Sequence, residues 1–246
     1  MMTELLLLTA AFLAGAMNAV AGGGSFLTLP ALIYAGVPPV AANATGTVAL
    51  LPGYASGLYG YRQDLTPVGE VGLPLLALVS LAGGLAGAGL LLVTPDAVFR
   101  GIVPWLLLAA TGLFAFGGAL AARLRAVGLH GRGALLGTLL VVSVYGGYFN
   151  GGLGILLLAQ LSLFGMTNLN AMNGLKNLFS TVLTAIAVVA YALGGAVDWP
   201  KAALMVLAAV AGGYVGARLG RRIPQRVLRG GIIAVGLTMS ALFFAK

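Results

Sequence analysis

Apolar residues fill most of this chain in long runs, which polar or glycine-rich breaks separate. The runs reach about 20 residues, the length that an α-helix needs to cross the hydrocarbon core of a membrane. The pattern predicts an all-α, polytopic membrane protein with helices over ten ranges: 3–21, 25–36, 40–60, 70–93, 98–120, 132–150, 154–166, 170–193, 199–217 and 227–245.

Two of these ranges, 25–36 and 154–166, are too short for an ordinary crossing. Twelve residues of α-helix measure about 18 Å, against a hydrocarbon core about 30 Å thick. Each short range adjoins a glycine-rich break, Gly22–Gly24 in the first case and Gly151–Gly154 in the second. We therefore expect half-helices or short tilted crossings that begin at breaks in the membrane interior.

The chain matches itself without a gap when it is shifted by 129 residues, which places Gly22 on Gly151. We call this shift the repeat offset. Other glycine and proline breaks then coincide, since Gly83 falls on Gly212 and Pro95 on Pro224. Such breaks at one constant offset are stronger evidence for an internal repeat than matching leucines. We expect a first transmembrane repeat over 1–120, a cytoplasmic linker over 121–131 and a second transmembrane repeat over 132–246.

The basic residues predict how the repeats are oriented. They form two clusters, which are Arg123, Arg125 and Arg132, then Arg218, Arg221, Arg222, Arg226 and Arg229. The positive-inside rule places both clusters in the cytoplasm. Both clusters lie on one side only if an even number of helices crosses the membrane between them. The range 154–166 must therefore count as a crossing. Each repeat then has five segments, and the two repeats are inverted. Two re-entrant hairpins would give the same parity, so that alternative stays open.

Composition excludes several other classes. The chain is 60% hydrophobic and 7% charged, whereas soluble domains carry roughly a quarter charged residues. The net charge of +8 lies mostly in short loops, so it indicates membrane orientation and not nucleic-acid binding. There is no Cys, and the single His130 lies in a polar loop. No carboxylate lies deep in a predicted span, so any proton coupling would use Lys176 or the substrate's own protonation. Without paired carboxylates or a Cys/His cluster in the spans, we expect neither an enzyme nor a bound metal or cofactor.

The two breaks are the candidate substrate site. The first N–H groups of a helix lack partners in the helix and carry partial positive charge. Two half-helix starts that face each other inside a membrane therefore favour an anion. Ser25 is the expected N-cap of the first short helix, and Asn168 and Asn170 are expected donors in the second half. We predict these substrate-binding residues: Gly23, Gly24, Ser25, Asn43, Thr45, Thr47, Gly152, Gly154, Asn173, Lys176 and Asn177.

Several of the polar and glycine residues have a plainer interpretation. Lys176 lies inside a predicted span, where a charge costs at least about 2.5 kcal/mol. It either pairs with the anion or lies shallow and extends its ammonium to the surface. Asn150 and Gln160 are expected to bond backbone between helices. Six glycines in later helices are expected to serve close packing: Gly83, Gly84, Gly87, Gly212, Gly213 and Gly216.

Two stretches resemble a known family. Residues 21–47, A-G-G-G-S-F-L-T-L-P-A-L-I-Y-A-G-V-P-P-V-A-A-N-A-T-G-T, and the later Y-G-Y-R look like the N-terminal signature of the sulfite exporter TauE/SafE family. The stretch Y-F-N-G-G-L-G-I-L-L-L over 148–158 resembles its repeat. The resemblance implies a bacterial-type transporter in the plasma membrane, or bacterial inner membrane, that exports sulfite, sulfonates or related organosulfur anions.

Three functions follow from this interpretation. The first is a secondary transporter for a small anion that contains oxidised sulfur. The second is a passive anion channel with the same site, and the third is a non-transporting membrane subunit or assembly factor. The expected partners are the substrate and the lipid bilayer, and self-association into a homo-oligomer is left open.

Overall fold

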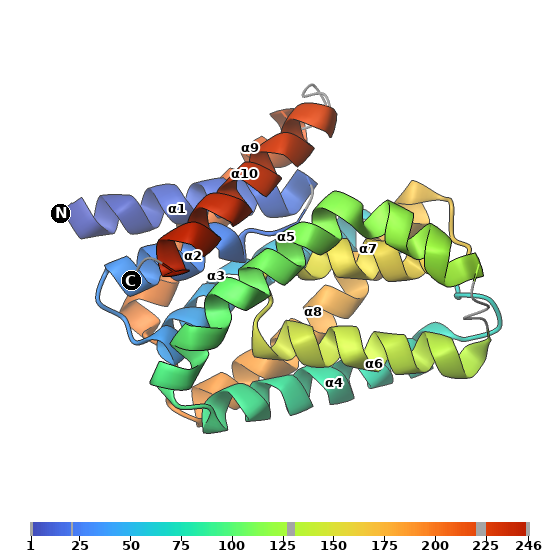
Figure 1. Ribbon diagram of the computed structural model, residues 1–246, viewed down its shortest axis with the longest axis horizontal. Helices are drawn as coiled ribbons and strands as arrows, with labels where there is room; N and C mark the ends of the chain where they lie inside the picture. The colour runs from blue at the N-terminus through green and yellow to red at the C-terminus, as the bar shows by residue number, and fades with distance from the viewer. Residues whose placement is uncertain (1, 21, 127–130, 220–224, 245–246) are drawn as a thin grey trace.

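The computed structural model describes residues 2–20, 22–126, 131–219 and 225–244. This part of the chain forms ten α-helices and a short 3-10 helix, η1, without a β-strand (Figure 1). The all-α class is confirmed, and each predicted range is occupied by a helix. The elements are α1 (Met2–Val20), α2 (Ser25–Tyr34), α3 (Pro39–Gly60), η1 (Arg62–Asp64), α4 (Leu73–Val93), α5 (Asp96–Ala126), α6 (Arg132–Tyr148), α7 (Leu153–Leu163), α8 (Leu169–Leu193), α9 (Trp199–Leu219) and α10 (Gln225–Phe244).

The two predicted short helices are short in the structure. Helix α2 has 10 residues and α7 has 11, which corresponds to about 15 and 17 Å. Gly36 and Gly165 follow their ends with φ of 83° and 84°, a left-handed conformation that glycine adopts without a Cβ penalty. The N–H of Val37 then bonds to the carbonyl of Leu32, and equivalent bonds follow Gly165. Positions related by the repeat offset thus end their helices in the same way.

Helix α5 is longer than predicted. The sequence pattern ends the apolar range at residue 120, but the helix continues to Ala126 into the predicted linker. The added segment, A-A-R-L-R-A, consists of Ala, Leu and Arg, which are among the strongest helix formers. Residues 127–130 of this linker, and 220–224 of the second basic loop, lie outside the described residues.

Glycines bring the long helices into close contact, as predicted. A Cβ added to Gly87 of α4 would lie 2.1 Å from the carbonyl oxygen of Val144 on α6. A Cβ added to Gly216 of α9 would lie 2.5 Å from the Cα of Ala16 on α1. Gly83, Gly84 and Gly212 make equally close approaches, whereas Gly213 makes only an ordinary contact with Gly15. Close packing is therefore confirmed for five of the six.

Helices pack in pairs that relate the two halves of the chain. Helix α1 packs along α9, and α6 packs along α4. Helix α3 contacts α8, and α5 contacts α10. Each contact has its equivalent at the repeat offset. Because the pairs join one half to the other, the halves form one body.

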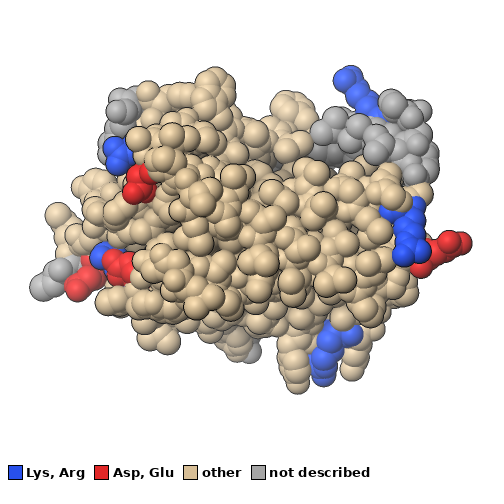
Figure 2. Space-filling model, turned by 90° about the horizontal axis from the view of Figure 1, so that it is seen from below, with Lys and Arg blue, Asp and Glu red and all other residues tan. Residues whose placement is uncertain are grey.

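Equivalent helices run in opposite directions along the long axis in Figure 1. The starts of α1, α3, α5 and α9 lie toward the left, with Glu4, Asp96 and Asp198; we call this the Asp198 end. The ends of α3 and α5 and the starts of α6 and α8 lie toward the right, with Arg62, Arg123 and Arg132; we call this the Arg132 end. Figure 2 shows charged side chains toward both ends and none across the middle of the face drawn.

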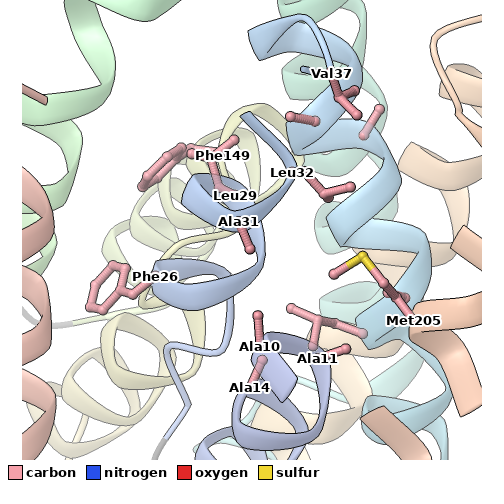
Figure 3. Close-up of a cluster of buried hydrophobic side chains, with 14 of the residues drawn as sticks. Ala10, Ala11, Ala14, Phe26, Leu29, Ala31, Leu32, Val37, Phe149 and Met205 are labelled. Carbon is pink, nitrogen blue, oxygen red and sulfur yellow. The ribbon is translucent and has the colours of Figure 1, made fainter. Parts of the chain in front are cut away.

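Apolar side chains fill much of the interior and of the long helices. Helices α1, α4, α5, α8 and α9 contain segments long and apolar enough to cross a membrane. Inside, α2 lies in the larger buried cluster, where Figure 3 shows Phe26, Leu29 and Phe149 on one side and the alanines of α1 on the other. The short helix α2 is thus enclosed by protein, as irregular backbone at membrane depth requires.

Candidate functional site

The two glycine breaks meet inside the molecule. A Cβ added to Gly22 would lie 3.4 Å from the Cα of Gly154, at the start of α7. A Cβ added to Gly152 would lie 3.5 Å from the ring of Phe26, at the start of α2. Each break therefore contacts the short helix of the other half, as the repeat predicted. All four positions are buried.

The backbone at both breaks adopts left-handed conformations. Gly22 and Gly23 have φ of 83° and 97°, and Gly152 has φ of 72°. Asn150 has φ of 60° and is the one described residue other than glycine with positive φ. Asparagine tolerates this conformation better than most side chains. These residues turn the chain sharply, so that both short helices begin at the centre of the molecule.

Lys176 lies against this meeting point. Its Cδ atom is 3.3 Å from the position that a Cβ would take on Gly154. Lys176 is only 4% exposed, and no residue in the described part of the chain accepts a hydrogen bond or forms an ion pair with its ammonium. Because the residue as a whole is buried, the structure favours the buried alternative. A buried ammonium without a partner is costly unless an anion pairs with it.

Asn18, Tyr54 and Asn150 form a polar group at the same place, and we did not predict Asn18 or Tyr54. The Tyr54 hydroxyl donates to Oδ1 of Asn150 over 3.1 Å and also neighbours the side chain of Asn18. Oδ1 of Asn18 accepts the Gly24 N–H over 2.8 Å. The Nδ2 groups of Asn18 and Asn150 are buried without a partner in the described protein. The centre thus contains two amide donors without an acceptor in the described protein.

Ser25 is buried at the start of α2 but is not its N-cap. Gly24 occupies the N-cap and already has helical φ and ψ of −54° and −30°. The N-cap lies one residue earlier than predicted, because the N–H of Phe26 bonds to the carbonyl of Gly23 and that of Leu27 to the carbonyl of Gly24. The Gly24 N–H is taken by Asn18. Ser25 therefore retains a hydroxyl that the cap does not require.

The three predicted residues of α3 are buried and hydrogen-bonded within the protein. Asn43 donates to the carbonyl of Tyr148 over 3.0 Å, just before the second break. Thr47 donates to the carbonyl of Asn43. The hydroxyl oxygen of Thr45 accepts the N–H of Asp198 over 3.0 Å, at the Asp198 end. Asn43 is thus joined to the second break, whereas Thr45 is joined to a loop that connects α8 and α9.

The asparagines of α8 occupy different depths. Asn177 is 7% exposed, and its side chain packs on Gly57 of α3. Asn173 is half-buried and donates to the carbonyl of Leu169 in its own helix. Asn168 is the N-cap of α8 and accepts from the N–H groups of Asn170 and Ala171. We had expected Asn168 to donate; it accepts, because the free N–H groups of a helix start require an acceptor.

Gln160 bonds backbone between helices, as predicted. Its Nε2 donates to the carbonyl of Leu135 on α6 over 3.2 Å and to the Thr138 hydroxyl. Asn150 differs, because its partner is the Tyr54 side chain. Gln160 therefore holds α7 against α6, whereas Asn150 belongs to the polar centre.

This arrangement suits a small anion held by neutral donors and one positive charge. Lys176 contributes an ammonium, and Asn18 and Asn150 contribute amide N–H groups. The starts of α2 and α7 add partial positive charge. No Asp or Glu of the sequence lies in the central part of a helix near these groups. Transporters commonly place such sites at broken helices between two repeats.

Comparison with known proteins agrees with this class. A "Probable membrane transporter protein ORF9" of Sinorhizobium sp is 30% identical over 97% of this chain and 91% of its own length. "Probable membrane transporter protein YfcA" of Escherichia coli (strain K12) is 29% identical over 94% of this chain and 86% of its own. A "Probable membrane transporter protein" of Haemophilus influenzae is 28% identical over 94% of this chain and 90% of its own length. No solved structure matches at a significant level.

The protein is therefore a multi-pass membrane transporter of the plasma membrane. The sequence profile described as Sulfite exporter TauE/SafE matches residues 7–243. The chain belongs to this family, which confirms the resemblance of its two glycine-rich stretches.

Proposed function

We propose that this transporter is a secondary carrier that exports sulfite, sulfonates or related small organosulfur anions. The anion binds where the two glycine breaks meet. The observation that carries this proposal is the buried ammonium of Lys176, which has no partner in the described part of the chain. An anion beside it would remove the cost of an isolated charge.

The neighbouring donors favour an oxyanion over a halide. Leaving a buried donor unsatisfied costs about 1–3 kcal/mol, and Asn18 and Asn150 each leave an Nδ2 group without a partner in the described protein. Sulfite and sulfonate groups carry three oxygens that accept hydrogen bonds. We propose that one such group engages Lys176 and both amides together. Among oxyanions, the description of the matching family as sulfite exporters favours a substrate with oxidised sulfur.

The remaining predicted site residues have different roles in this proposal. Gly23, Gly24, Ser25, Gly152 and Gly154 lie at the breaks. Asn177 follows Lys176 in α8, and its side chain packs against Gly57 of α3. Asn43 supports the second break through Tyr148. Thr45, Thr47 and Asn173 bond protein groups in this conformation, so a role in binding requires those bonds to change during transport.

The inverted repeats also remain a proposal, with residues 1–120 and 132–246 joined by the linker 121–131. Its support is that α2 and α7 both begin at the centre and run toward opposite ends in Figure 1. The halves also exchange contacts through α1 with α9 and α6 with α4. A site on the axis between such halves lies near the membrane midplane and can open to either side.

Transport by purified protein in proteoliposomes tests this function. Efflux of sulfite, sulfoacetate and sulfate should be compared side by side, with empty liposomes as control. We expect the sulfite or sulfoacetate flux to exceed that of sulfate, and external substrate to accelerate efflux by exchange. Flux without exchange would indicate a channel, and absence of flux for all three anions would contradict the proposal.

A further inference from the structure

Lys176 is the one charged residue that is buried among those whose side chains the structure describes. The arginines with described side chains, Arg62, Arg100, Arg123 and Arg132, are all exposed. The candidate site therefore offers one full positive charge to a ligand. The number of charges at a buried site limits the number that a bound anion can carry without leaving an excess.

The two other described cations with printed partners are occupied away from the centre. Lys201 forms its ion pair with Asp198 at the Asp198 end. Arg62 donates to the carbonyl of Tyr59 over 2.7 Å, and its guanidinium lies 4.1 Å from the centroid of the Tyr59 ring. Neither side chain supplies a second positive charge beside Lys176.

The elements packed against α8 add no buried charge. They are α3, α4, α6, α7 and η1. Helices α4 and α7 carry no titratable residue, and those of the other three elements are Tyr54, Tyr59, Arg62, Asp64, Arg132, Tyr145 and Tyr148. Tyrosine is neutral around neutral pH. Asp64, the one carboxylate among these residues, is only half-buried at the Arg132 end.

The starts of the two short helices contribute less than another full charge. A helix start carries at most about half an elementary charge, which resides on N–H groups without a partner. In α2 the N–H groups of Phe26 and Leu27 already bond to carbonyls of the first break. In α7 those of Ile155 and Leu156 bond to a carbonyl of the second break. Much of the partial charge at both starts is therefore compensated by the chain itself.

The remaining donors of the centre are neutral. The Gly24 N–H holds Oδ1 of Asn18 over 2.8 Å, and the Tyr54 hydroxyl holds Oδ1 of Asn150 over 3.1 Å. Because each amide oxygen is engaged, the group that each side chain leaves without a partner is its Nδ2. The centre thus has several neutral N–H donors but one full charge.

We propose that this site takes singly charged oxyanions, namely hydrogensulfite and monoanionic sulfonates, and rejects doubly charged sulfite and sulfate. The proposal rests on the proposed function, in which the anion lies beside Lys176. A monoanion neutralises the ammonium and uses the neutral amides for its several oxygens. A dianion leaves one excess negative charge in apolar surroundings, which is costly.

This selectivity couples sulfite export to a proton. Sulfite exchanges one proton near neutral pH, so the dianion takes one proton from the cytoplasmic solution and forms hydrogensulfite. The carrier binds this form, and hydrogensulfite returns the proton to solution on the other side. One proton then leaves with each sulfite on the substrate itself, without a carboxylate in the spans. Export of a sulfonate moves no proton.

A series of ligands of similar tetrahedral shape tests the charge preference. Dimethyl sulfone, methanesulfonate and sulfate carry no, one and two negative charges. Calorimetric titration in detergent compares wild type, Lys176→Met and the control Lys201→Met, whose lysine is paired at the surface. We expect wild type and Lys201→Met to bind methanesulfonate at least about tenfold tighter than the other two ligands. In Lys176→Met the preference for methanesulfonate over dimethyl sulfone should disappear.

The second measurement compares sulfite with methanesulfonate in wild type from neutral to alkaline pH, so it does not depend on the folding of a variant. Methanesulfonate keeps its single charge over this range, whereas hydrogensulfite is lost. The ratio of sulfite to methanesulfonate affinity should therefore fall by up to about tenfold per pH unit, the limit for one proton. Loss of a proton from the protein acts on both monoanions and leaves this ratio unchanged.

Three results would overturn the charge proposal while leaving the anion site intact. They are sulfate binding as tight as that of methanesulfonate, a ratio that stays constant or rises with pH, and a wild-type charge preference in folded Lys176→Met. Absence of binding of both sulfite and methanesulfonate to wild type at every pH would instead contradict the proposed function on which it rests.

Discussion

The two described lysines show how surroundings decide the role of a side chain. Lys201 forms an ion pair of 2.5 Å with Asp198 at the surface, a kind of pair that contributes little to stability. Burial raises the pKa of Asp198, but the hydrogen bonds and charge of Lys201 lower it by more, so the pKa lies below its ordinary value. Lys176 has no such carboxylate in the described structure and is buried. The first lysine is an anchor, and the second is the centre of the proposed anion site.

Ser25→Ala should weaken sulfite binding without destabilising α2. Gly24 is the N-cap, so the Ser25 hydroxyl is not needed to begin the helix. A hydrogen bond to a charged group contributes about 1.5–3 kcal/mol, which corresponds to a loss of about ten- to a hundredfold in affinity. Calorimetric titration with sulfite measures this, with the exposed Ser56→Ala on α3 as control. Unchanged affinity in a folded variant would assign Ser25 a structural role only.

Much of the site was predictable at the residue scale because the repeat pointed to it. The glycine breaks and Lys176 lie together, as the repeat offset suggested. Tyr54 was missed because its partner Asn150 lies 96 residues away in sequence. Asn18 was missed although its partner, the Gly24 N–H, belongs to the nearby first break. The position of Asn18, one helical turn before Gly22, was a signal that could have been used.

At the scale of elements, the breaks place the starts of two short helices at the centre. Helix positions were predictable because prolines and glycines interrupt the apolar runs around α2 and α7. The end of α5 was not, because hydrophobicity falls where helix propensity stays high. Which helices form pairs was also not predictable, since the glycine faces fit several partners equally well by sequence.

Gly22→Ala should reduce both stability and sulfite affinity, whereas Gly36→Ala should reduce stability alone. Both glycines have φ of 83°, where a Cβ costs about 1–2 kcal/mol. An added Cβ at Gly22 lies 3.4 Å from the Cα of Gly154, and one at Gly36 meets nothing within 4 Å. Thermal unfolding in detergent and sulfite titration separate the two effects. Equal affinities in both variants would mean that the break does not shape the site.

Gly87→Val should destabilise the protein more than Gly89→Val on the same helix. A Cβ at Gly87 would lie 2.1 Å from the carbonyl oxygen of Val144, and Gly89 has no atom within 4 Å of that position. Overpacking a close contact costs about 1–3 kcal/mol. The measurement is thermal unfolding of both variants under identical conditions. Similar stability would show that α4 and α6 do not pack as closely as the structure has them.

At the scale of the whole molecule, the proposed plan is two halves that run in opposite directions. Charged side chains lie toward the two ends of the face drawn in Figure 2, and none lies across its middle. The sequence suggested this plan because a repeat of glycines and an asymmetric distribution of arginines are visible in one chain.

Cysteine labelling tests the orientation of the two halves, since the chain has no native Cys. Gln63→Cys after α3 and Thr167→Cys after α7 should react with an impermeant maleimide from the cytoplasm. Tyr34→Cys at the end of α2 should react from the outside, because Tyr34 lies at the Asp198 end and is 74% exposed. Reaction of Tyr34→Cys and Thr167→Cys from the same side would contradict inverted repeats.

The central claim is that Lys176 is the positive partner of the transported anion, and sulfite affinity in Lys176→Met and Lys176→Arg tests it most directly. Lys201→Met is the matched control, because it removes a lysine of the same protein that is paired at the surface. The account predicts that Lys176→Met loses about ten- to a hundredfold in affinity or more. Lys176→Arg should retain part of the affinity, and Lys201→Met should equal wild type. Wild-type affinity and transport rate in folded Lys176→Met would contradict the account.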